Sequence, residues 1–160
     1  MRAEDVLYDL ANQGESQTVE FKESLTSSAK RKAIEAMVAF ANSEGGWLFF
    51  GVTNDGVLKG VQIGGDTLEK LAVEIRDHTY PSLPVVIEAI PGRDRRRHIV
   101  GVQVPADVPP AIGVYLYSKE SIAVGRQVDA GALQAFRRVG RMNQKEDFMR
   151  LRRPLPSDPR

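Results

Sequence analysis

The sequence predicts an α+β fold with mixed, largely antiparallel sheets, hairpins and three or four helices. Several stretches carry apolar residues at the three-to-four-residue spacing of a helix. Two turn segments, 53–56 and 91–97, separate short β-type runs, which is typical of hairpins. Hydrophobic residues make up 42% and charged residues 27% of the 160-residue chain, a composition that excludes wholesale disorder.

The first predicted helix covers residues 4–13 and ends at Gly14. Polar and apolar residues then alternate in 18–22, which predicts a strand. Because alternate side chains of a strand point to opposite faces, Glu20 and Lys22 are expected side by side, facing away from the core.

A largely buried helix is predicted for residues 29–44, with Ser27 or Ser28 as its N-cap and Gly45-Gly46 after its end. Its first turn holds three basic residues, Lys30, Arg31 and Lys32. Positive charge at this end opposes the helix dipole, so a contact with phosphate is one explanation. The other is that these side chains are simply solvated around the helix.

The run 47–52 is continuously apolar, which predicts a central strand buried on both faces. Residues 53–56 (Thr-Asn-Asp-Gly) predict a tight turn, after which 57–61 is expected to return antiparallel. A further helix is predicted from Asp66, as its N-cap, to a point near His78.

The second half begins with a hairpin whose strands are 85–90 and 98–104. Strands are also predicted at 114–117 and 136–139, and a last helix at 144–152. We expect one domain over residues 1–153 and a disordered, proline-rich tail over residues 154–160.

The net charge of +1 conceals two halves of opposite sign. Residues 1–92 contain eight basic and 14 acidic residues, a net charge of −6, whereas residues 93–160 contain 14 basic and seven acidic residues, a net charge of +7. Such asymmetry indicates self-association or an anionic partner for the second half, with a solvated basic tail as the alternative. We expect the later arginines to form one continuous cationic surface.

Several classes of protein are excluded by what the sequence lacks. There is no cysteine, so disulfides, thiol catalysis and cysteine-ligated metal sites are excluded. Neither a Gly-x-x-x-x-Gly-Lys-Ser/Thr loop nor Gly-x-Gly-x-x-Gly occurs, so no site for nucleotide hydrolysis or dinucleotide binding is predicted. No apolar run reaches the ~18 residues that span a bilayer, and we expect a cytoplasmic protein with no membrane partner.

Carboxylates near the first long helix and in the first hairpin are candidates for chemistry. Glu15, Glu20 and Asp55 are candidate ligands of Mg²⁺ or Mn²⁺, since carboxylates that converge on one point can hold such an ion and the ion can activate water against a phosphodiester. Lys22 would then stabilise the developing phosphate charge. Alternatively, these are ordinary surface carboxylates, and Asp55 serves only its turn.

Four segments stand out in combination. They are Glu15–Ser24, which contains Glu-Phe-Lys, then Ala39–Gly46 (Ala-Phe-Ala-Asn-Ser-Glu-Gly-Gly), Phe49–Gly56 and Phe136–Asn143. The last contains Arg138, Gly140 and Asn143 in an aromatic-x-Arg-x-Gly-x-x-Asn pattern. Over about residues 10–153 the chain resembles the Schlafen-type AlbA domain family.

The resemblance implies an α+β fold and nucleic-acid binding, including DNA binding with a transcription-related role. In the Schlafen branch the domain is an endoribonuclease that acts on structured RNA, and its acidic residues correspond to Glu15, Glu20 and either Asn54 or Asp55. If Asn54 takes the hairpin position, one metal-binding carboxylate is missing. Larger relatives carry an ATPase or winged-helix region after this domain, so a stand-alone module or a fragment is expected.

The first hypothesis is therefore a binding module for DNA or RNA with weak sequence preference, which needs no cofactor. One alternative is an endoribonuclease that uses Glu15, Glu20, Lys22 and Asp55 with Mg²⁺ or Mn²⁺. The other is a structural domain whose acidic and basic halves pair in a homodimer. We expect a binding module rather than an enzyme. Its candidate contacts are the basic residues Lys30, Arg31, Lys32, Arg93, Arg95, Arg96, Arg97, Arg137, Arg138 and Arg141. For the turn 93–97, the alternative is again a solvated loop.

Overall fold

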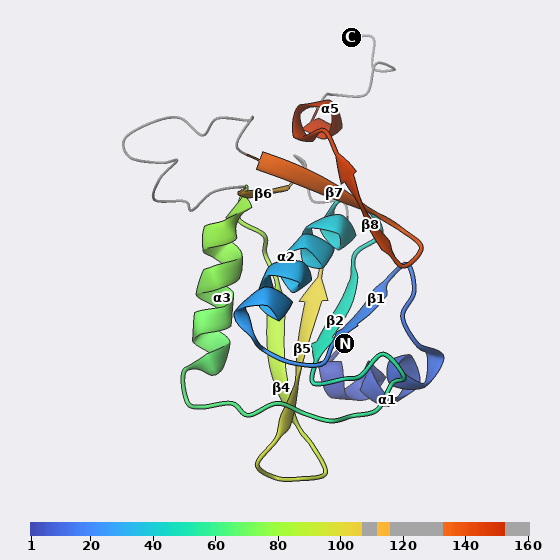
Figure 1. The fold of residues 1–160 in the computed structure, drawn as a ribbon, viewed down its shortest axis with the longest axis vertical. Coiled ribbons are helices and arrows are strands. Elements are labelled where there is room, and N and C mark those ends of the chain that lie inside the picture. The colour runs from blue at the N-terminus through green and yellow to red at the C-terminus, as the bar shows by residue number, and fades with distance from the viewer. Residues whose placement is uncertain (107–111, 116–132, 153–160) are drawn as a thin grey trace.

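The computed structural model describes residues 1–106, 112–115 and 133–152 (Figure 1). Within these residues the chain forms four helices and two four-stranded sheets, which confirms the predicted α+β class. The helices are α1 (Ala3–Gln13), α2 (Ser27–Ala41), α3 (Thr67–His78) and the short α5 (Phe148–Arg152). The predicted tail over 154–160 lies outside the described residues. No helix in the described part is long and apolar enough to cross a membrane.

The first sheet has the strand order β1-β2-β5-β4. Its strands are β1 (Val19–Lys22), β2 (Gly46–Phe50), β4 (Val86–Pro91) and β5 (His98–Val104). The strands β1 and β2 are parallel, with α2 as the crossover between them, and the remaining pairs are antiparallel. The strand β2 is central and its Leu48, Phe49 and Phe50 have no exposed surface, so the predicted burial on both faces is confirmed.

Helices cover both faces of this sheet. On one face, Leu7 of α1 belongs to the same apolar cluster as Phe21 and Phe49. On the other, α2 and α3 form a larger cluster that includes Met37 and Ile75. Each fully buried side chain of this size contributes ~1.5–3 kcal/mol through the hydrophobic effect. On β1, Glu20 is buried, unlike the prediction, and Lys22 at the end of the strand remains partly exposed.

The second sheet is antiparallel and packs near the C-terminal end of α2 (Figure 1). Its strands, in order, are β3 (Thr79–Tyr80), β6 (Gly113–Tyr115), β7 (Leu133–Val139) and β8 (Met142–Glu146). The two-residue β3 was not predicted because so short a segment has no periodicity. Residues 116–132, which include the end of the predicted strand 114–117, lie outside the described residues.

Two predicted elements are wrong for reasons of strand pairing. Residues 57–61 do not return as a strand, because both edges of β2 are occupied by β1 and β5. The segment instead forms isolated bridges, from Leu58 to Val52 and from Val61 to His98. The predicted helix 144–152 is instead β8 followed by α5. Gly140, at φ +59°, forms the turn that lets β8 pair with β7.

The ends of α2 also differ from the prediction. Thr26, rather than Ser27 or Ser28, is the N-cap, and its Oγ1 accepts a hydrogen bond from the Ala29 backbone N–H at 3.2 Å. The helix ends at Ala41, three residues earlier than predicted, and Asn42 and the residues after it form a turn into β2. This turn brings polar side chains to the second sheet.

Candidate functional site

Arg138 lies between the two sheets and is not the surface contact that the sequence predicted. Its side chain has no exposed surface. All five guanidinium N–H groups have acceptors. Nη1 donates to Glu20 Oε1 at 2.8 Å and to Asn143 Oδ1 at 2.7 Å. Nη2 donates to the Ser16 carbonyl at 2.8 Å and to the Val19 carbonyl at 3.0 Å, and Nε donates to the Ser16 carbonyl at 3.2 Å. The guanidinium carbon also lies 4.8 Å from the centre of the Phe40 ring. We call this arrangement the Arg138 joint.

Strand alternation explains why Arg138 is inside while its neighbours are outside. Arg137 and Val139 are exposed on one face of β7, and Arg138 and its cross-strand partner Asn143 point to the other. That face meets β1, where Glu20 is 5% exposed. Glu20 faces the second sheet and not solvent, which corrects the prediction.

Basic side chains also lie near the other carboxylate oxygens of this region, Glu20 Oε2 and those of Glu15. Glu20 Oε2 is buried, has no hydrogen-bond partner among the described residues, and lies 3.4 Å from Lys22 Nζ. Glu15 Oε1 accepts from the Phe21 backbone N–H at 3.0 Å, and its Oε2 is 3.6 Å from Arg141 Nη2. Two carboxylates are thus matched by three cations, Lys22, Arg138 and Arg141.

The predicted Mg²⁺ or Mn²⁺ site does not fit this geometry. Glu15 and Glu20 are close to cations that a divalent ion would have to displace. Asp55 is exposed in the turn after β2, beside α1, and takes no part in the Arg138 joint. In the part of the chain that the structure describes, no three His, Cys, Asp or Glu side chains are grouped to hold a metal ion.

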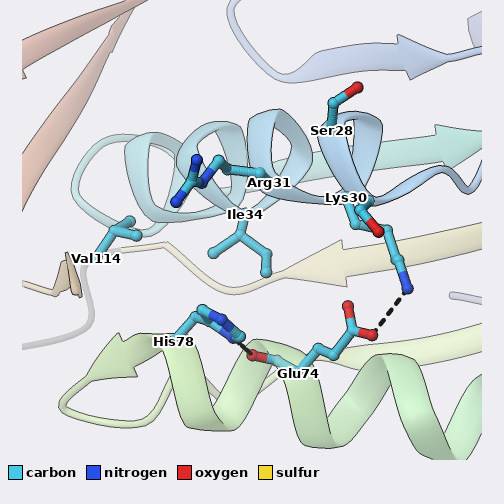
Figure 2. A pocket seen from close by; sticks show the side chains of 8 residues that line it. Ser28, Lys30, Arg31, Ile34, Glu74, His78 and Val114 are labelled. Atoms are coloured by element: carbon cyan, nitrogen blue, oxygen red, sulfur yellow. Dashed lines mark hydrogen bonds and ion pairs between the residues drawn. The ribbon is translucent and has the colours of Figure 1, made fainter. Parts of the chain in front are cut away.

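The predicted cations of α2 are mostly committed to acids. Lys30 Nζ pairs with Glu74 Oε1 of α3 at 2.8 Å, and Lys32 lies 3.7 Å from Glu35. Arg31 is exposed, and its side chain borders a cavity of about 560 Å³ between α2 and α3, where Lys30 and Glu74 meet and His78 lies on the opposite wall (Figure 2). The pairing with Glu74 lowers the net positive charge of this cavity.

The β4–β5 turn has the opposite character. Its Arg93, Arg95 and Arg96 are exposed, and no carboxylate among the described residues lies within ion-pair distance of them. Backbone bonds from Gly92 N to Arg97 O and from Arg97 N to Asp94 O, both 2.9 Å, close the turn. Arg97 is half-buried, and its Nη1 donates to the Gly60 carbonyl at 3.2 Å. We call residues 93–97 the arginine turn.

Among the described residues, the later arginines do not form the expected continuous cationic surface. The arginine turn joins β4 and β5 of the first sheet, whereas Arg137 lies on β7 of the second sheet and Arg141 in the turn between β7 and β8, and the two turns lie well apart (Figure 1). Arg138 is buried. The candidate arginines at 93–97, 137, 138 and 141 therefore divide into an exposed turn, a buried joint and a separate exposed pair.

The sequence matches the model of a known protein family. The family model described as Schlafen, AlbA_2 matches residues 15–146. The chain belongs to the Schlafen AlbA_2 family. No curated protein sequence matches the chain significantly.

Two solved structures share the fold of this Schlafen AlbA_2 domain. The N-terminal domain of a RecG-related protein, described as a putative ATP-dependent DNA helicase, from Nitrosomonas europaea has a TM-score of 0.52 and 24% identity, over 90% of this chain and 93% of that one. The DIP2311 protein from Corynebacterium diphtheriae has a TM-score of 0.54 and 17% identity, over 90% of this chain. The chain spans 29% of the length of DIP2311.

Three of the four family-like segments, 15–24, 39–46 and 136–143, meet at or beside the Arg138 joint of this Schlafen AlbA_2 domain. Asn42 Nδ2 donates to the Ile112 and Phe136 carbonyls, both at 2.9 Å, and its Oδ1 accepts from Ile112 N–H. Ser43 Oγ accepts from the Arg138 backbone N–H at 2.9 Å, and Gln17 binds the Arg138 carbonyl and Gly140 N–H. In the sequence, Asn42, Ser43 and Asn143 stand out only as parts of motifs, and no local pattern predicts these hydrogen bonds.

Proposed function

We propose that this domain binds DNA or RNA through the arginine turn, by phosphate contacts with weak sequence preference. The observation that carries the proposal is the set of three exposed guanidinium groups, Arg93, Arg95 and Arg96, that no carboxylate of the described residues neutralises. Membership of the Schlafen AlbA_2 family and the helicase-related fold neighbour support a nucleic-acid-related role.

The arginine turn brings three exposed guanidinium groups, which have no ion pair among the described residues, into four consecutive positions, 93–96, whereas several other surface cations are paired with acids. Lys59, Lys70 and Arg76 lie 2.9, 3.0 and 3.4 Å from carboxylates, so much of their charge is compensated within the protein. The exposed guanidinium groups of the arginine turn have no ion-pair partner in the described part of the chain, so their positive potential can attract an anionic partner. Guanidinium groups bind phosphate oxygens in a bidentate manner, and a two-stranded ribbon can lie along a groove. Such contacts need no metal ion or other cofactor, and phosphate contacts alone carry no sequence information.

The test is a salt titration of binding to a fluorescent oligonucleotide, single-stranded and duplex. We expect affinity to fall steeply between about 50 and 200 mM salt, because bound phosphates release counterions. Replacing Arg93, Arg95 and Arg96 by Gln should lower the salt slope by about 2 to 3, since each phosphate contact contributes about 0.9.

The matched control removes the same charge elsewhere. Arg2, Lys70 and Arg76 are exposed and each lies near an acid, so replacing them by Gln should leave the slope nearly unchanged. A wild-type protein whose binding shows no salt slope contradicts the proposal, as does a control variant that loses as much affinity as the turn variant. Light scattering at low and high salt tests the predicted homodimer separately.

A further inference from the structure

A groove of about 400 Å³ lies beside the arginine turn. Its walls come from the last turns of α1, the turn after β2 and the arginine turn, and its lining includes Tyr8, Asn12, Asp55, Gly56, Val57 and Arg93. Pockets that hold small molecules begin at about 300 Å³, so this groove suits a ligand of one nucleotide and not a large cofactor. We call it the Tyr8 groove.

Tyr8 gives the groove an exposed aromatic ring that the core does not use. The α1 helix buries Ala3, Leu7 and Ala11 against the sheet, while Tyr8 remains 63% exposed. Asn12 follows one turn later, so both side chains lie on the same side of the helix. Across the groove Val57 is 59% exposed. Two apolar surfaces of this kind, one of them aromatic, suit the flat face of a base.

The walls of the groove are held in place by the fold. Gly56 has φ +82°, and a Cβ there would clash with the Ala11 carbonyl, so the turn after β2 packs directly on α1. Thr53 Oγ1 accepts from the Val57 N–H at 3.0 Å, and the Thr53 carbonyl accepts from Gly56 N–H at 2.9 Å. The groove is therefore preformed, which reduces the entropy that a ligand has to overcome.

Its polar groups are free to bind. Within the described residues, the Asn12 and Asp55 side chains have no hydrogen-bond partner and Arg93 has no ion-pair partner. The groove thus offers a cation, an amide and a carboxylate around apolar surface. A carboxylate accepts hydrogen bonds and cannot donate them, so it selects a ligand edge that carries an N–H donor.

We propose that the Tyr8 groove holds one unpaired nucleobase stacked on Tyr8, with the adjoining phosphate on Arg93 and the base edge on Asn12 and Asp55. This inference rests on the proposed function and narrows its substrate to nucleic acid with unpaired bases, because the faces of bases within a duplex are already stacked. Asp55 favours bases with an exocyclic amino group, as carboxylates accept from cytosine N4.

The test compares oligomers of deoxycytidine, oligomers of deoxyuridine and a duplex, by fluorescence anisotropy at one salt concentration. We expect wild-type protein to bind oligodeoxycytidine more tightly than the other two. Tyr8→Ala should weaken that binding about 5- to 150-fold, the range that base–aromatic stacking supports, while Tyr8→Phe keeps the ring and most of the affinity. Val73→Ala on α3, where Val73 is 42% exposed, is the control and should bind as wild type does.

A second variant tests the base edge. Asp55→Asn, which suits a turn equally well, should reduce the preference for deoxycytidine over deoxyuridine, since an amide both donates and accepts. If Tyr8→Ala binds as tightly as wild type, or if duplex and single strand bind equally, the base site is wrong, although a normal salt slope still supports the arginine turn. If wild-type protein binds no oligonucleotide, both the base site and the proposed function are wrong.

Discussion

Two hairpins of this domain carry arginines, and their environments give the arginines different tasks. In the β4–β5 hairpin, Arg93, Arg95 and Arg96 are exposed and unmatched by carboxylates of the described residues. In the β7–β8 hairpin, Arg138 is fully buried with an acceptor for every N–H. A count of arginines therefore does not show what they do, because burial and partners decide whether the charge acts inside the protein or on another molecule.

The energetics of the two hairpins differ in the same way. Burying a guanidinium and a carboxylate carries a desolvation cost, which is offset only when hydrogen bonds complete both groups. Arg138 meets this condition, whereas Glu20 Oε2 has only Lys22 nearby, at 3.4 Å. Exposed charges are solvated and screened, so those of the arginine turn contribute little to folding.

The largest expected effect is on stability at the Arg138 joint. Arg138→Ala should lower the free energy of unfolding by ~3–5 kcal/mol, because it leaves the buried Glu20 Oε1 without its guanidinium partner. Urea denaturation measures this effect. The control is Arg137→Ala, an exposed neighbour on the same strand, for which we expect a change within about 0.5 kcal/mol.

A double variant separates the charge from the space it fills. Arg138→Met combined with Glu20→Leu removes both buried charges and should recover much of the stability that Arg138→Met loses alone. Equal losses for Arg138→Ala and Arg137→Ala would show that the two arginines do not differ as the structure indicates.

A smaller effect is expected from the amide that ties α2 to the second sheet. Asn42→Ala removes three hydrogen bonds and leaves carbonyls of Ile112 and Phe136 without this donor, so we expect a loss of ~1–3 kcal/mol in urea unfolding. Asn54→Ala, in the exposed turn after β2, is the matched control and should cost less. Because Asn42 is remote from the arginine turn, the salt slope of binding should not change, and a changed slope would mean that the two hairpins are coupled.

The smallest effect on stability is expected from the exposed ion pair between Asp66 and Lys70, which contrasts with the buried pair of the Arg138 joint. The hydrogen bond from Lys70 and its charge lower the pKa of Asp66 below the ordinary value of 3.8. Because the pKa is lower in the folded state, the ionised carboxylate stabilises the fold at pH values above the ordinary pKa. This stabilisation is lost as the pH falls through the lowered pKa.

Asp66→Asn should therefore lower the thermal unfolding midpoint slightly at neutral pH and leave it unchanged in strong acid, where the wild-type carboxyl is already protonated. Lys70→Gln should give the same profile, since it removes the partner that lowers the pKa. A loss of equal size at both pH values would show that the carboxylate charge is not the cause.

Local patterns predicted much of the fold and less of the site. Apolar spacing placed α1 and α3, and the run 47–52 was correctly interpreted as a central buried strand. The burial of Arg138 was not predictable from its neighbours, because its partner Glu20 is 118 positions away and no periodicity links them. The path of the turn that carries Asp55 depends on β1 and β5 occupying both edges of β2, and this strand order is also a long-range property.

The distance along the chain between Glu20 and Arg138 also determines when the domain can be completed during its synthesis. Every strand of the first sheet lies before residue 105, so that sheet can form while β7 is still within the ribosome. Until β7 emerges, Glu20 lacks the guanidinium of Arg138 beside it. Docking of the β7–β8 hairpin supplies that partner, so a segment made later completes the surroundings of a strand made earlier.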